Sequence, residues 1–128
     1  MAGVEAPLNF TYLLGKAFIP IAFLMGVPSD DVEEVATLVG IKTVVNEFTA
    51  FQRLGTESNI SARAKTIATY ALCGFANPGS IGIQLGGLGA MAPERKQELA
   101  QLVTRAFIAG CFTSFLNACV AGALISSK

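Results

Sequence analysis

The sequence predicts an all-α membrane protein with an interfacial helix, a re-entrant helical hairpin, a broken transmembrane helix and a long transmembrane helix. Of its 128 residues, 52% are hydrophobic and 14% are charged, and the mean hydropathy is +0.56. Soluble domains carry about 25% charged residues. Residues 66–92 contain no charged side chain, and about 20 mostly apolar residues cross a bilayer. The middle of that run is rich in Gly, Asn, Pro and Ser, which predicts a break in the helix.

The composition argues against several kinds of function. The formal net charge is zero, so there is no electrostatic case for nucleic acid as a partner. The chain has no His and three Cys, which argues against a zinc site and a His-based catalytic triad. Cys73, Cys111 and Cys119 all lie in apolar segments, and we expect them to be buried small side chains rather than disulfide partners.

The first apolar segment, residues 9–27, is too short to span a bilayer. Its uncharged part, residues 17–29, would be about 20 Å long as a helix, whereas the hydrocarbon core is roughly 30 Å thick. We therefore expect an interfacial helix here. Pro20 is expected to kink it.

Residues 29–55 predict a helical hairpin. Ser29 or Asp30 can cap its first half, and the polar pair Asn46-Glu47 separates that half from a second short apolar piece. Neither half is long enough to span. Two short halves that meet at a polar tip indicate a re-entrant hairpin, with Glu47 at membrane depth.

Residues 61–91 predict the broken helix. Ser61 can cap its start, and its end is expected near Met91. Residues 94–125 predict a second long helix, whose part from 106 to 125 is uncharged and long enough to span. Small side chains recur there every four residues and predict a face that packs against another helix. They are Gly110, Ser114, Ala118 and Gly122.

Glu47 is the first candidate functional residue. A carboxylate among Val44, Val45 and Phe48 costs at least about 2.5 kcal/mol inside a membrane, so it is a functional candidate by default. The alternative is that Glu47 lies on a surface loop and faces water. Lys42, five residues earlier, can either neutralise Glu47 or extend to the membrane interface.

The break supplies the other candidates, Phe75, Asn77 and Ser80. Asn offers a donor and an acceptor, Ser offers a hydroxyl, and Phe offers a face for a planar ligand. A half-helix that starts near Ser80 would point its positive end at the site. The alternative is a proline-kinked packing helix whose polar groups bond to the local backbone. Asn117, in the last helix, is open to two interpretations, an interhelical hydrogen bond or a cavity lining.

Two motifs resemble a known family. Residues 40–51 (GIKTVVNEFTAF) look like the signature G-x-K-x-x-x-N-E-F-V-A of the concentrative nucleoside transporters, which are cation-coupled symporters. A second block of that family is similar to residues 71–96, through ALCGFAN, SIG, GGL and PERK. The resemblance covers about residues 9–125, and it is to the C-terminal repeat only, so we expect this chain to be a fragment or one half of a larger assembly.

The resemblance implies a site and an assembly. By resemblance, Glu47, Asn77 and Ser80 hydrogen-bond the ribose of a nucleoside, and Phe75 packs against it. Members of the family are homotrimers in the plasma membrane or the bacterial inner membrane, with several spans per chain. The resemblance implies no organic cofactor, and it implies that the main site for the coupling ion, Na⁺ or H⁺, lies outside this chain.

Two residues depart from the family pattern. Pro78 replaces an aromatic or aliphatic residue, and we expect it inside the unwound region. Thr49 replaces the usual Val beside Glu47, a change that conserves volume and adds polarity. A rival reading is a structural or regulatory membrane fragment that does not itself transport. An enzyme that uses Glu47 as general acid or base lacks a recognisable second catalytic group, so we expect no enzyme.

Overall fold

The computed structural model describes residues 10–56 and 59–125. Within those residues all regular secondary structure is helical, as predicted, and there is no strand. The helices are α1 (Phe10–Leu24), α2 (Val32–Val44), α3 (Glu47–Thr56), α4 (Ala62–Leu72), α5 (Pro78–Met91), the short 3₁₀ helix η1 (Pro93–Arg95) and α6 (Lys96–Leu124).

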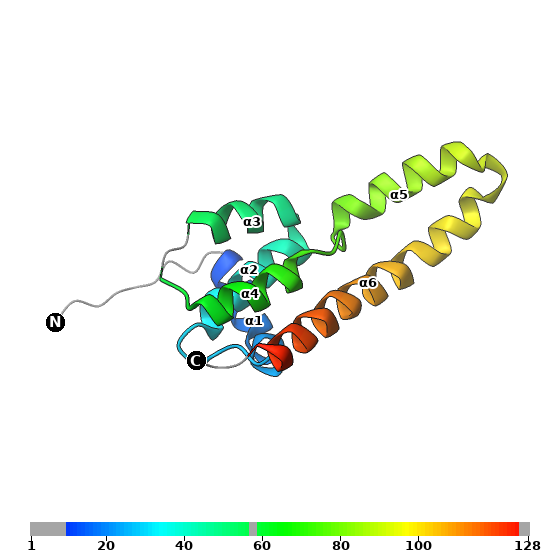
Figure 1. Ribbon diagram of the computed structural model, residues 1–128. Helices are drawn as coiled ribbons and strands as arrows, with labels where there is room; N and C mark the ends of the chain where they lie inside the picture. Colours follow the sequence, from blue (N-terminus) through cyan, green and yellow to red (C-terminus); the bar gives the residue numbers. More distant parts are fainter. Residues whose placement is uncertain (1–9, 57–58, 126–128) are drawn as a thin grey trace.

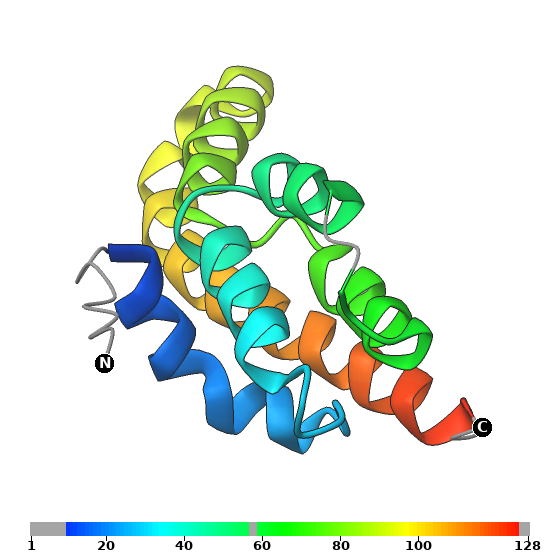
Figure 2. The ribbon, with the colours of Figure 1, turned by 90° about the vertical axis from the view of Figure 1, so that its left-hand side faces the viewer.

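The four short helices α1 to α4 form a bundle, and α5 and α6 extend from it as a long antiparallel pair (Figure 1). The C-terminal part of α6 returns to the bundle and packs along α4. Helix α2 lies in the middle of the bundle and contacts α1, α3 and α4 (Figure 2). This arrangement brings the turn between α2 and α3 close to the end of α4.

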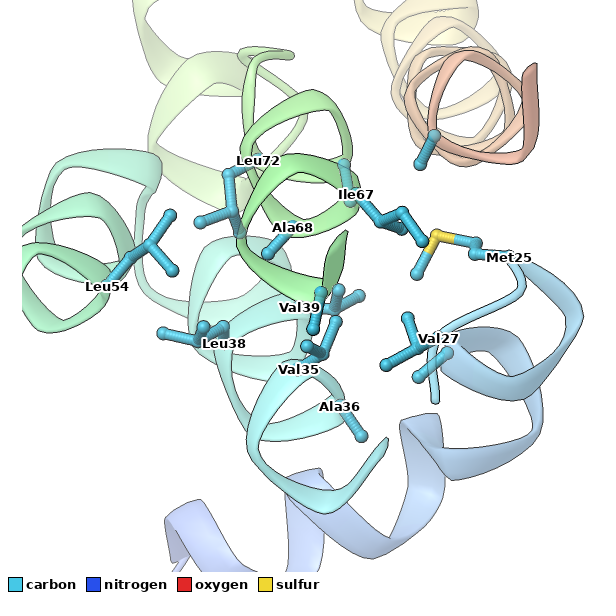
Figure 3. Close-up of a cluster of buried hydrophobic side chains, with 14 of the residues drawn as sticks. Met25, Val27, Val35, Ala36, Leu38, Val39, Leu54, Ile67, Ala68 and Leu72 are labelled. Carbon is cyan, nitrogen blue, oxygen red and sulfur yellow. The ribbon is translucent and has the colours of Figure 1, made fainter. Parts of the chain in front are cut away.

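The hydrophobic core is centred on α2 and includes residues of α1, α3, α4 and α6. Val35 and Leu38 of α2 and Ile67 and Leu72 of α4 are fully buried, and Leu54 of α3 packs with them (Figure 3). A fully buried side chain of this kind contributes about 1.5–3 kcal/mol to stability. The core therefore fixes the α2–α3 pair against α4.

The predicted stripe of small residues on α6 is a packing face. Ser114, Ala118 and Gly122 are buried. A Cβ atom on Gly122 would lie 2.5 Å from the carbonyl oxygen of Met25, and one on Gly110 would lie 3.3 Å from the Cβ of Ala76. The absence of larger side chains thus lets α6 approach both the end of α1 and the segment between α4 and α5.

Helix α1 ends at a left-handed glycine. Gly26 has φ +81°, and the N–H groups of Met25, Gly26 and Val27 donate to the last carbonyls of the helix, as at many helix C-termini. The helix continues through Pro20 without interruption. The kink expected at Pro20 stays a prediction, and Pro20 lies on the exposed side of the helix.

The start of α2 differs from the prediction. The residue at its N-cap is Asp31, not Ser29 or Asp30, and its side chain makes no capping hydrogen bond. The carboxylate of Asp31 instead accepts from the backbone N–H and the hydroxyl of Ser61, the latter at 2.5 Å. Ser61 caps α4, as predicted, through its hydroxyl and the N–H of Ala64. Asp31 therefore joins two helix starts, which a local sequence pattern does not reveal.

Helix α6 is much longer than the other helices. Among the described residues, one helical stretch, Pro93–Leu124, has the length and apolar composition to cross a membrane. Helices α4 and α5 contain 11 and 14 residues, or about 16 and 21 Å at 1.5 Å per residue. Each is shorter than a bilayer core, and the break from 73 to 77 separates them.

The three cysteines are free, as expected, but they are not all buried. Cys111 is buried and Cys119 is half-buried, whereas Cys73 is exposed. The expectation for Cys73 is wrong because this residue begins the break, where the chain leaves the bundle and no helix covers it.

Candidate functional site

The turn between α2 and α3 sets the position of Glu47. Helix α2 ends at Val44 and α3 begins at Glu47. The side-chain oxygen of Asn46 accepts from the backbone N–H of Thr49 at 2.8 Å, so Asn46 satisfies one of the free N–H groups at the start of α3. Glu47 lies in the first turn of α3, where the positive end of the helix favours a carboxylate. It is only 5% exposed, so it does not face water as the alternative interpretation held.

Asn77 sets the start of α5. Its backbone is extended, with φ −154° and ψ 167°, and its Oδ1 accepts from the N–H of Ser80 at 2.9 Å. Pro78 follows as the first residue of the helix, where a missing N–H has no cost and a fixed φ is favourable. Pro78 therefore lies at the helix start and not inside the unwound segment, which corrects the sequence prediction. The break comprises residues 73–77.

A hydrogen bond between Asn77 and Glu47 joins the break to the hairpin tip. The Nδ2 of Asn77 donates to Oε2 of Glu47 at 2.5 Å, and both side chains are buried. The amide of Asn77 thus acts twice, because its oxygen caps α5 and its nitrogen holds the carboxylate. In the alternative interpretation, the polar groups of the break bond only to the local backbone. That interpretation is wrong for Asn77, because its partner Glu47 lies 30 positions away in the sequence.

Phe75 is the exposed aromatic residue of the site. Its side chain is 63% exposed, and that of Phe48, the residue after Glu47, is 69% exposed. The two rings meet edge to face, with centroids 6.0 Å apart and an interplanar angle of 77°. The hairpin tip and the break therefore contact each other twice, through the polar pair Glu47–Asn77 and through this aromatic pair.

A groove of about 610 Å³ runs between α5 and α6 and reaches the break. Phe75, Asn77 and Ser80 line it, and Asn117 of α6 lines it as well. Glu47 does not line the groove and reaches this region through Asn77. The structure therefore brings all four predicted residues into one neighbourhood, with three on the groove and Glu47 behind Asn77. For Asn117 this geometry supports the cavity-lining alternative.

Lys42 belongs to the same region, and sequence reasoning did not decide its role. Its side chain is fully buried, so it does not extend to the membrane interface. Its place five residues before Glu47 was the available signal, but its ammonium lies against the ring of Phe115 on α6, a contact that the sequence pattern does not show.

The chain is similar to transporters over nearly all of its length. Residues 2–122 match the family described as Na⁺ dependent nucleoside transporter C-terminus. The chain is 46% identical to mouse sodium/nucleoside cotransporter 1, across 91% of this chain and 20% of the relative. It is 44% identical to human solute carrier family 28 member 3, across 94% of this chain and 20% of the relative. The chain thus spans about a fifth of the curated relatives it matches.

Solved structures of the transporter CNTnw share the fold. An inward-facing, substrate-bound structure matches with a TM-score of 0.84 and 38% identity, across 90% of this chain and 29% of that one. An intermediate state of a CNTnw variant matches with a TM-score of 0.86 and 36% identity, across 93% and 30% of the two chains. The chain therefore belongs to the sodium-dependent nucleoside transporter family, and it corresponds to the C-terminal part of its members.

Proposed function

We propose that this chain supplies the C-terminal half of the nucleoside site of a cation-coupled symporter. The observation that carries the proposal is the buried hydrogen bond between Asn77 and Glu47. It holds a carboxylate beside an amide, and the residue that carries the amide lines the groove between α5 and α6. A ribose presents neighbouring hydroxyl groups, which can donate to a carboxylate and bond to an amide. The pair matches that ligand in chemistry.

The four residues have separate roles in this proposal. Glu47 accepts a hydrogen bond from one ribose hydroxyl, and Asn77 bonds another with its remaining N–H. Ser80, in the first turn of α5, offers its hydroxyl at the positive end of that helix. Phe75 packs against the nucleoside with the ring surface that it leaves exposed.

The placement in a membrane follows the same reasoning. Helices α2 and α3 contain 13 and 10 residues, too few to span singly, and their turn carries Glu47. We propose that this pair is a re-entrant hairpin, that α4 and α5 form one broken span, and that α1 is interfacial. The whole protein would be a multi-pass homotrimer in a plasma membrane or a bacterial inner membrane.

The remainder of the transporter has the complementary half of the site in this proposal. Relatives are named sodium/nucleoside cotransporters, so we propose Na⁺ or H⁺ as the coupling ion, with its main site outside this chain. The isolated chain, reconstituted in detergent, should then not bind uridine measurably by isothermal titration calorimetry. Binding as tight as that of the full-length transporter would contradict the assignment of half a site.

The direct test is Glu47→Gln in the full-length transporter that contains this chain. The substitution keeps the shape and removes the charge. A hydrogen bond to a charged group contributes about 1.5–3 kcal/mol, so we expect the KM for uridine uptake to rise about tenfold to a hundredfold. Glu33→Gln is the matched control, because Glu33 is an exposed carboxylate of α2 paired with Lys16. Unchanged uptake by Glu47→Gln would contradict the proposed role.

A further inference from the structure

Lys42 is buried without a hydrogen-bond partner. It lies in the last turn of α2, its side chain is 0% exposed, and among the described residues its Nζ is the buried side-chain polar atom that lacks a partner. An ammonium group carries three donors and a full charge. Burial of such a group is costly unless its surroundings compensate for it. The surroundings of Nζ therefore indicate what the charge does.

The ammonium lies where the break meets α6. Its Nζ is 5.6 Å from the ring centroid of Phe115 on α6, which places the cation against an aromatic ring. Gly74, in the break, has no side chain, and a Cβ there would lie 3.7 Å from Nζ and 2.0 Å from the Oγ of Ser114. The break and α6 are thus in tight contact at Gly74, and the ammonium lies beside that contact.

Two sources of negative potential lie in this part of the fold. Helix α4 ends at Leu72, two residues before Gly74, and the last carbonyls of a helix have no partner within it and form its negative end. Burial opposes the charge of Lys42 most strongly, and the carboxylate of Glu47 is among the groups that favour it. The other titratable groups that interact with it are the thiols of Cys73 and Cys111.

We propose that Lys42 is a tethered cation for the broken helix. Its ammonium supplies a positive charge beside the break, between Gly74 and the ring of Phe115. It balances the charge of Glu47. It also fixes the backbone conformation of residues 73–77, so that Asn77 and Ser80 point toward the ligand. Lys42 is a positioning residue, since Asn77 and Ser80 rather than Lys42 contact the nucleoside. The inference rests on the proposed function of this site. It adds that nucleoside binding there requires the positive charge of Lys42.

Chemical rescue in the full-length transporter tests this proposal. Lys42→Ala removes the ammonium and leaves a space that propylammonium, the missing part of the side chain, can fill. Lys42→Met fills the same space without charge. We expect both variants to take up uridine with a KM raised about tenfold or more, because a buried charge loses its partner. Propylammonium should restore uptake by Lys42→Ala only, because the methionine side chain leaves no space for it.

Two controls separate the outcomes. Lys65→Ala removes an exposed lysine of α4 and should respond to no amine. Fluorescence-detected size exclusion should find Lys42→Met folded, because methionine preserves the packing volume. Uptake by Lys42→Met with the wild-type KM, or failure of propylammonium to restore Lys42→Ala, would overturn the tethered cation. Either result would leave the effect of Glu47→Gln on uptake unchanged. The Glu47→Gln measurement therefore tests the proposed function independently of the role of Lys42.

Discussion

The Nδ2 atom of Asn77 lies 2.5 Å from the Oε2 atom of Glu47, and this hydrogen bond connects the start of α5 to the start of α3. Both residues lie at the positive ends of their helices. The carboxylate is therefore stabilised by one helix directly and by the capping residue of another. A carboxylate held in this way is fixed in direction before any ligand arrives, which reduces the ordering cost of binding.

Substitution of Phe75 should change the affinity for the nucleoside without changing the stability of the fold. Because its ring is 63% exposed, Phe75→Leu should change the melting temperature little. The loss of a stacking face worth about 0.5–1.5 kcal/mol should raise the KM for uridine about twofold to tenfold. The matched control is Phe112→Leu on α6, where the ring is 64% exposed and does not line the groove. Equal effects of the two substitutions on KM would contradict the role of Phe75.

Gly74 and Ser114 should behave as a coupled pair. Gly74→Ala places a Cβ 2.0 Å from the Oγ of Ser114, so we expect it to lower the free energy of unfolding by about 1–3 kcal/mol through overpacking. Ser114→Ala removes that oxygen. The double variant should regain most of the loss, which thermal unfolding followed by size exclusion can measure. Additive losses would show that the clash is not the cause.

Gly122 offers a test of the packing between α6 and the end of α1. Gly122→Ala would bring a Cβ within 2.5 Å of the Met25 carbonyl oxygen, a backbone atom that cannot rotate away. We expect a loss of about 1–3 kcal/mol. Gly86→Ala, in α5, has nothing within 4 Å of the new Cβ, and it should be neutral or stabilise the helix by up to about 1 kcal/mol. Equal melting temperatures for the two variants would contradict the packing.

The sequence predicts the local features of this fold well. The start of α4 at Ser61 and the end of α5 at Met91 follow from capping and turn residues. The packing face of α6 follows from small residues at a spacing of four. Each depends on residues close together in the chain, so a local pattern contains the required information.

The features that the sequence did not reveal depend on tertiary contacts. Asp31 bonds to Ser61 across 30 residues instead of capping its own helix. Lys42 is buried, and its ammonium lies against the ring of Phe115 on α6. The membrane positions of the hairpin and of α1, the trimer and the identities of the ligand-binding residues remain predictions.

A double-mutant cycle on Glu47 and Asn77 tests the central claim most directly. Uridine affinity would be measured by isothermal titration calorimetry for the full-length transporter and for Glu47→Gln, Asn77→Ser and the double variant. Serine at position 77 retains the capping oxygen, so α5 should keep its start. We predict that each single variant weakens binding about tenfold or more and that the double variant loses much less than the sum of the two losses. Wild-type affinity in all three variants would contradict the claim that this pair binds the nucleoside.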